Sequence, residues 1–245
     1  MADPENTPFR MNDDYVAHEE LVRQLCDPKL RDDYARPLDD YKPGIVPSVL
    51  GWLLVLMGNV FYGHKPSYLK FKAIEVVARI PYQSWESAAY TLLTAFYGNE
   101  AHAVRLCRMA AFSRFAQDNE TMHVVVISSI VRKMNKDAFF RHTLIPILFC
   151  FFYFWAIYLI YMFSHRAALE LNYVFESHAY RQYSQFLKDN EDHLRSTPVM
   201  SDFLAFYGRE FRNEYEFFES VRNDELIHRN RSIREIESHK RVWDR

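Results

Sequence analysis

The chain has 245 residues, which suits one domain, and its formal net charge of −2 gives no reason to expect a nucleic-acid partner. It contains 20 Phe and 16 Tyr but only 6 Gly, a composition that favours helices over turn-rich sheet and predicts an all-α protein. Because Cys26, Cys107 and Cys150 are far apart and lack metal-binding spacing, we expect reduced structural thiols.

The N-terminal region, residues 1–43, is polar and contains five prolines, which predicts an extended arm with one short helix around residues 13–25. Its first ten residues, MADPENTPFR, resemble neither a secretory signal nor a transit peptide. We therefore expect the chain to begin in the cytoplasm, unless a targeting segment has been removed.

The region from residue 44 to 237 is predicted to form one helical domain, followed by a tail at 238–245. It opens with an apolar segment at 45–62, which small and polar residues interrupt. Pro81 is expected to bend one helix, a break is expected near Gly208 in another, and residues 189–198 are predicted to form a polar linker. The other helices are predicted at residues 67–97, 100–134, 167–187 and 200–237.

A second apolar segment, residues 144–163, holds 20 residues without a charge. By itself it favours a membrane-spanning helix, since such a length crosses a hydrocarbon core of about 30 Å. Its many aromatic residues also suit the membrane interface, where a helix can lie in the plane of the bilayer. Both interpretations remain open at this point.

Carboxylates and histidines recur in an ordered pattern on four predicted helices. Two helices each carry a Glu-x-x-His motif, which places both side chains on one helix face. Each of these helices is preceded by a helix with a glutamate in an apolar setting. Four-helix di-iron and di-manganese proteins use this combination of residues. The six candidates, in chain order, are Glu75, Glu120, His123, Glu176, Glu225 and His228.

The chemistry of burial supports a metal site. Four unpaired carboxylates in one core would cost more than ~10 kcal/mol, which is comparable to the whole stability of a domain. Two divalent cations would cancel the four charges, and oxygen-rich ligands with two imidazoles suit iron or manganese. The simpler alternative is that each Glu-x-x-His lies on a solvated helix face.

The same positions carry a resemblance to a known family. The segments are IEVVARIPYQSWESAAY at 74–90, QDNETMH at 117–123, FESHAYRQYSQFL at 175–187 and NDELIHR at 223–229. Together they resemble the alternative oxidases, and most of all their plastid terminal oxidase branch, over about residues 40–235. The resemblance implies a ferritin-like four-helix bundle with a di-iron core and membrane-dipping helices. It also implies a quinol:oxygen oxidoreductase, using plastoquinol or ubiquinol, that reduces O2 to water without pumping protons.

By this resemblance the six candidates are the ligands of two Fe ions, and Asn119 and Asp224 orient those ligands by hydrogen bonds. Tyr183 matches a tyrosine that takes part in redox chemistry and quinol binding. Two other expected quinol-binding residues depart from the family pattern: Gln182 replaces a threonine, and Lys70 replaces an arginine, which keeps the charge but not the planar guanidinium.

The resemblance also changes the membrane interpretation. Family members bind one leaflet without crossing it, so residues 45–62 and 144–163 are expected to dip into one face of a membrane. We expect the cytoplasmic or stromal face of a plasma, thylakoid or plastid membrane, and a homodimer is possible. Two alternatives remain: a di-iron quinone-ring hydroxylase, and a metal-free helical membrane scaffold. Glu86, eleven residues after Glu75, is expected to be a structural or rim carboxylate rather than a ligand.

Overall fold

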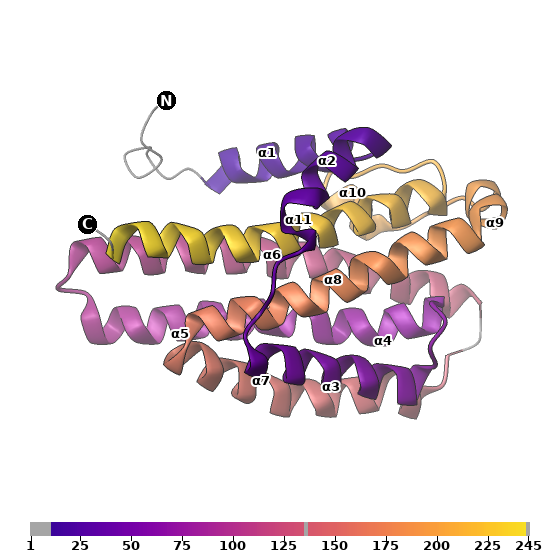
Figure 1. Ribbon diagram of the computed structural model, residues 1–245. Coiled ribbons are helices and arrows are strands. Elements are labelled where there is room, and N and C mark those ends of the chain that lie inside the picture. Colours follow the sequence, from indigo (N-terminus) through magenta and orange to yellow (C-terminus); the bar gives the residue numbers. More distant parts are fainter. Residues whose placement is uncertain (1–10, 135–136, 244–245) are drawn as a thin grey trace.

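The computed structural model describes residues 11–134 and 137–243, and within these ranges every regular element is a helix (Figure 1). The all-α prediction is therefore confirmed. The helices are α1 (Met11–Gln24), α2 (Pro28–Asp39), α3 (Ile45–Tyr62), α4 (Tyr68–Ala78), α5 (Ile80–Phe96), α6 (Glu100–Lys133), the π-helix η1 (Phe140–Leu144), α7 (Ile145–Phe163), α8 (His165–Asp189), α9 (Glu191–Ser196), α10 (Asp202–Phe206) and α11 (Glu214–Trp243).

The core is a four-helix bundle, as predicted. Helix α8 packs along α11, and α6 packs along the pair α4 and α5, which together form the fourth rod of the bundle. Helix starts are set by side-chain caps: Ser67 accepts a hydrogen bond from the Lys70 amide, and Asn99 accepts one from the His102 amide. These caps fix where the helices that carry the site begin.

The junction between α4 and α5 lies at Arg79, two residues before the proline that was predicted to bend this helix. Pro81 lacks an amide hydrogen and fits the first turn of a helix, where that donor would have no partner. The Ser84 hydroxyl donates to the Ile80 and Pro81 carbonyls. The predicted single helix is therefore two helices in one row.

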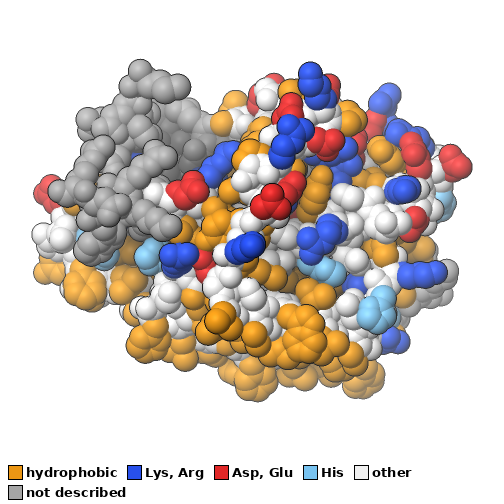
Figure 2. Space-filling view, in the orientation of Figure 1, with side chains coloured by type: hydrophobic (Ala, Val, Ile, Leu, Met, Phe, Trp, Pro, Cys, Tyr) orange, Lys and Arg blue, Asp and Glu red, His pale blue; other side chains and the backbone are white. Residues whose placement is uncertain are grey.

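Helices α3 and α7 both run along the lower side of the bundle in Figure 1, and residues of both line one cavity. Each is long and apolar enough to cross a membrane, and each is mostly exposed. Trp52 is 60% exposed on α3, and Phe152 is 70% exposed on α7. Figure 2 shows hydrophobic side chains gathered along this lower edge, whereas the charged side chains in that view lie mainly above it. We call the outward surface of α3 and α7 the apolar face.

Two segments predicted to be irregular are helical. Residues 28–39 form α2 although they include Pro28 and Pro37: Pro28 occupies the first turn, where its missing amide hydrogen would have no partner, and the helix ends two residues after Pro37. Asp27 caps this helix by accepting from the amides of Lys29 and Leu30 at 2.8 and 3.2 Å. In the predicted linker, residues 191–196 form the short helix α9.

Near both ends of the chain, the described residues contain more helix than the sequence predicted. Helices α1 and α2 both pack against α11, so the predicted N-terminal arm adds a layer to the bundle. The predicted last helix is α10 and α11 with a break at residues 207–213, where Gly208 has a φ of 69°. Helix α11 continues into the range predicted as a tail. Residues 1–10 of the arm and 244–245 of the tail lie outside the described residues.

Candidate metal centre

The four rods of the bundle bring all six predicted candidates together. One helix of each antiparallel pair carries a single glutamate, and the other carries the Glu-x-x-His motif. Every one of these side chains is at most 1% exposed. The contributing residues are Glu75 from α4, Glu120 and His123 from α6, Glu176 from α8, and Glu225 and His228 from α11.

The six residues form two overlapping groups, each able to hold a metal ion. One group contains His123 and the other contains His228, and within each group the candidate ligand atoms lie within 4.8 Å of one another. His123 Nδ1 lies 3.3 Å from a Glu120 oxygen, and His228 Nδ1 lies 2.8 Å from the other Glu120 oxygen. Glu120 and Glu225 belong to both groups, so these two carboxylates lie between two candidate cation positions.

The atoms that face the interior of the centre are mostly without hydrogen-bond partners among the described residues. Buried polar atoms of this kind are rare in folded proteins and require an explanation. A pair of cations would supply one, since the carboxylate oxygens and one nitrogen of each neutral imidazole have lone pairs of the type iron accepts. The atoms are Glu75 Oε2, both carboxylate oxygens of Glu120 and Glu225, Glu176 Oε2, His123 Nδ1, and both ring nitrogens of His228.

The charges of the protein alone do not allow all four carboxyl groups to ionise. Burial raises the pKa of Glu75 to about 7. Burial, together with the negative charges of Glu120 and Glu176, raises the pKa of Glu225 well above its usual value. Burial acts on Glu120 in the same direction, but the neighbouring His123 outweighs it and lowers the Glu120 pKa to about 2. Two divalent cations would provide the missing positive charge, so the residues fit a di-iron centre.

Two buried tyrosines contact the centre from opposite sides. The Tyr183 hydroxyl donates to Glu75 Oε1, and the Tyr82 hydroxyl donates to Glu176 Oε1 at 2.7 Å. Each tyrosine follows the glutamate of its own rod by seven residues but binds the glutamate of the other rod. Asn172 Nδ2 donates to the Tyr82 oxygen at 2.9 Å and so fixes that hydroxyl.

Sequence reasoning identified Tyr183 and missed Tyr82. The missed residue had a usable signal, because the seven-residue spacing from Glu75 to Tyr82 repeats the spacing from Glu176 to Tyr183. On the single helix predicted for residues 67–97, seven residues are close to two turns and would place both side chains on one face.

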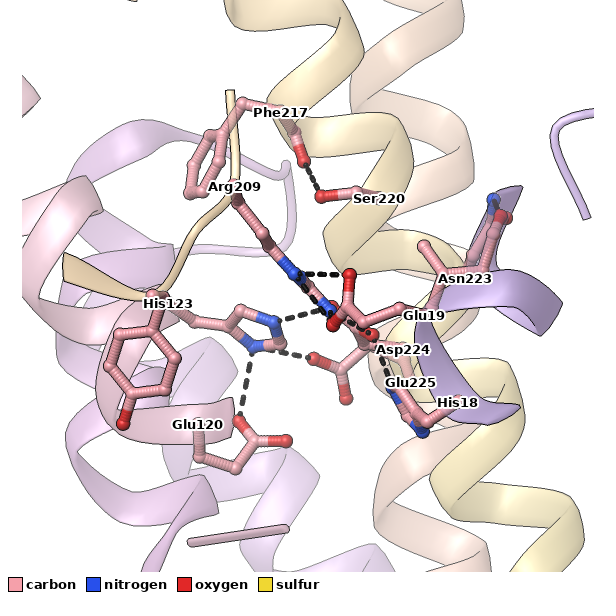
Figure 3. A network of polar contacts seen from close by, with 12 residues as sticks. His18, Glu19, Glu120, His123, Arg209, Phe217, Ser220, Asn223, Asp224 and Glu225 are labelled. Carbon is pink, nitrogen blue, oxygen red and sulfur yellow. Dashed lines mark hydrogen bonds and ion pairs between the residues drawn. The ribbon is translucent and has the colours of Figure 1, made fainter. Parts of the chain in front are cut away.

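The two residues predicted to orient ligands differ in their contacts. Asp224 is fully buried and accepts a hydrogen bond from His123 Nε2 at 3.0 Å, as expected for a residue that orients an imidazole (Figure 3). Asn119 is 6% exposed and adjoins Glu120, but its Oδ1 has no hydrogen-bond partner among the described residues. Sequence reasoning missed His18 and Arg209, which also contact Asp224 (Figure 3).

An apolar cavity adjoins Tyr183 on the side away from α11, and the predicted quinol-binding residues all line it. Lys70 is 1% exposed, and its ammonium donates to Gln182 Oε1 at 3.0 Å and to Asn59 Oδ1 at 2.9 Å. The lining residues are Leu54, Val55, Gly58, Asn59, Lys70, Phe71, Ile74, Phe175, His178, Ala179, Gln182 and Tyr183. We call this space the inner cavity.

A second apolar cavity lies beside the inner cavity and shares part of its wall. The shared residues are Leu54, Gly58, Ile74 and Phe175. The second cavity is otherwise lined by residues of α3, α4 and α7, including Phe61, which is 44% exposed. The two cavities therefore adjoin each other, one beside Tyr183 and the other between α3 and α7.

Glu86 does not join the centre. Its carboxylate accepts from Arg114 Nε at 2.9 Å, in an ion pair between α5 and α6. This contact agrees with the expected structural or rim role. The junction at Arg79 lies between Glu75 and Glu86, so the regular helical spacing from Glu75 to Glu86 is interrupted.

The chain is similar to known proteins over the region that contains the six clustered residues. The family model described as alternative oxidase matches residues 66–234. Ubiquinol oxidase 4, chloroplastic/chromoplastic, of Arabidopsis thaliana is 25% identical over 183 residues, a match that covers 66% of this chain and 49% of that protein. The chain thus spans about half the length of this curated relative. No solved structure matches it.

Proposed function

Since this chain belongs to the alternative oxidase family, we propose that it is a membrane-bound quinol oxidase that reduces O2 to water. The observation that carries the proposal is the buried set of four carboxylates and two imidazoles, whose inward atoms lack partners among the described residues. The relative named ubiquinol oxidase supports a quinol as the reductant.

We propose the six clustered residues as the ligands of two Fe ions. Bound iron would supply the oxygen-binding and electron-transfer chemistry. Four carboxylates balance the charge of two divalent cations, while the histidines remain neutral. Because Glu120 and Glu225 belong to both groups, each of them could help to hold either ion. Asp224 holds His123 with Nδ1 facing the centre.

The quinol would enter from the bilayer. The second cavity is lined by residues of α3 and α7, and it adjoins the inner cavity, which is lined by Tyr183, so a movement of the shared wall residues would complete the route. Such a route suits a substrate with an apolar tail, because nearly all of its walls are hydrocarbon. Polar groups occur where the quinol ring would stop, at Lys70 and Gln182.

At that end the residues can bind the quinol and move its protons. Lys70 donates to Gln182 Oε1, and the amide nitrogen of Gln182 carries N–H donors that can bind a quinol oxygen. The Tyr183 hydroxyl lines the inner cavity and donates to Glu75 Oε1. A proton from the quinol hydroxyl can therefore pass to Tyr183 Oη as the tyrosine proton moves toward Glu75.

The overall reaction balances without proton uptake from either side of the membrane. Two quinols release four electrons and four protons, and one O2 takes up the same four electrons and four protons to form two waters. Both quinone products return to the leaflet from which the quinols came. The same balance would hold for an oxidase that pumps protons, so the proposal that this enzyme does not pump them rests on its membership of the alternative oxidase family.

The arrangement of the helices favours binding to one leaflet. Helices α3 and α7 run along the bundle over their whole length, with contacts to α8 and to α5 respectively (Figure 1). If both crossed a bilayer, the charged surface on the rest of the bundle in Figure 2 would have to enter hydrocarbon. With the apolar face dipped into one leaflet, the charged surface stays in water.

The test is oxygen uptake by iron-loaded protein in liposomes. Addition of a quinol is expected to start oxygen uptake in the native chain and in Glu191→Ala, an exposed position paired with Arg195. Glu120→Ala is expected to abolish uptake and iron binding. Mass spectrometry of the recovered quinone separates the two enzyme classes, since a hydroxylase would add an oxygen atom to the ring. A native protein that binds neither iron nor manganese would contradict the proposal.

A further inference from the structure

Asp224 is contacted from three sides inside the protein. His123 Nε2 donates to Oδ2 at 3.0 Å, Arg209 Nη1 donates to the same oxygen at 2.8 Å, and His18 Nε2 contacts Oδ1 at 2.7 Å (Figure 3). The carboxylate is fully buried, and His18 is only 4% exposed. Asp224 is thus held as an acceptor by three residues from three different parts of the chain.

The contact with Asp224 fixes how His123 faces the centre. With its hydrogen on Nε2, a neutral imidazole has a free lone pair on Nδ1. That nitrogen lies 3.4 Å from Glu75 and 3.6 Å from Glu225. The opposite tautomer would point an N–H group at a cation in this position, so the orientation of Asp224 determines whether His123 can bind iron.

Helix α1 contacts both Asp224 and Arg209. His18 binds Asp224 directly, and the adjacent Glu19 accepts from Arg209 Nε at 2.9 Å (Figure 3). Arg209 therefore lies between two carboxylates, Glu19 on one side and Asp224 on the other. His18 and Asp224 are 206 residues apart in the chain, and α1 lies outside residues 66–234, the range that the family model matches.

We infer that α1 is part of the metal centre, with His18 as a positioning residue that acts through Asp224 on His123. The inference rests on the proposed di-iron site. The His18 ring also packs edge-on against Phe115 at 4.7 Å, so a purely structural role in docking α1 is the alternative. The positioning role depends on the N–H group of His18, whereas the docking role depends on its ring.

Two substitutions in the full chain separate these roles. His18→Phe keeps an aromatic ring against Phe115 and removes the donor to Asp224. His18→Gln loses the ring but keeps an N–H group at about the reach of Nε2. The matched control is Glu20→Gln, since Glu20 is exposed on the same helix and pairs with Arg23.

The readout is the affinity for each of the two Fe(II) ions, measured by titration of metal-free protein, together with thermal unfolding of the metal-free protein. Changes to residues that orient metal ligands weaken metal binding about 10- to 100-fold. We expect His18→Phe to weaken one iron site by this factor. His18→Gln should stay within about threefold of the native value, and Glu20→Gln should match it.

Two results would overturn the inference. Native iron affinity in His18→Phe would show that the donor has no role. Weaker iron binding in His18→Gln than in His18→Phe, with a matching loss of thermal stability in metal-free protein, would assign His18 to the docking of α1. If the native chain bound no iron in the same titration, the proposed function would fail along with this inference, and that result is distinct from the other two.

Discussion

Replacing Tyr183 with phenylalanine should separate catalysis from metal binding. The ring stacks on Phe71 with centroids 4.0 Å apart, and a phenylalanine keeps that contact. The lost hydroxyl donates to Glu75, and a hydrogen bond to a charged group contributes about 1.5–3 kcal/mol. At about 2–4 °C per kcal/mol in a chain of this size, the melting temperature should fall by roughly 3–12 °C.

The effect on the rate should be much larger than the effect on stability. If Tyr183 Oη carries the quinol proton, its loss removes general acid–base catalysis, which contributes about 10²- to 10⁴-fold. The assay is steady-state quinol oxidation in liposomes, with iron per chain measured on the same sample. We expect native iron content and a fall in kcat of about 100-fold or more.

Tyr82→Phe is the matched control for this prediction. Tyr82 also donates to a glutamate of the centre, Glu176, but it is not among the residues that line the inner cavity. A similar loss of stability is therefore expected, with a loss of kcat at least about tenfold smaller than in Tyr183→Phe. Equal rate losses in the two variants would refute the reasoning. They would show that the loss comes from the missing hydrogen bond to a glutamate and not from a missing proton acceptor for the quinol.

Three further predictions address individual residues. Glu75→Ala should lose iron and activity, whereas Glu86→Ala should retain both because Glu86 pairs with Arg114; metal analysis of the two variants checks this. Lys70→Met should raise the KM for quinol about tenfold or more with iron unchanged, because Lys70 contacts Gln182 and not the carboxylates, and an unchanged KM would remove Lys70 from quinol binding. The pKa of Glu170 is lowered: burial opposes ionisation, but the hydrogen bond from the Gly44 amide and those from Tyr41 and Arg166 outweigh it. Its stabilisation is thus present above the usual pKa of 4.5 and lost as the pH falls below it, so Glu170→Gln should flatten the acid side of the stability profile, measured by thermal unfolding against pH.

The bundle and the six clustered residues were predictable because their signals are local. A Glu-x-x-His pair lies within one helical turn, so the sequence alone places Glu120 beside His123. Apolar periodicity then predicts the helices that carry such pairs. Tyr82 could also have been found, since it repeats the seven-residue spacing that links Glu176 with Tyr183.

The contacts around Asp224 could not be predicted in the same way. His18 and Asp224 are separated by 206 residues, and Arg209 lies in the connection before α11, where no periodic pattern applies. Their meeting depends on how α1 docks on α11, which is a tertiary property. Helix α2 was missed for a local reason: its prolines indicated a break, although Pro28 occupies the first turn, which tolerates proline, and Pro37 lies only two residues before the end of the helix.

The stoichiometry of quinol oxidation tests the central claim most directly. Iron-loaded protein in liposomes would be given a limiting amount of O2, and the quinone formed would be measured with the water and peroxide produced. The proposed reaction predicts two unmodified quinones per O2 and no peroxide. One quinone per O2 with accumulating peroxide, or quinone that has gained an oxygen atom, would contradict the account.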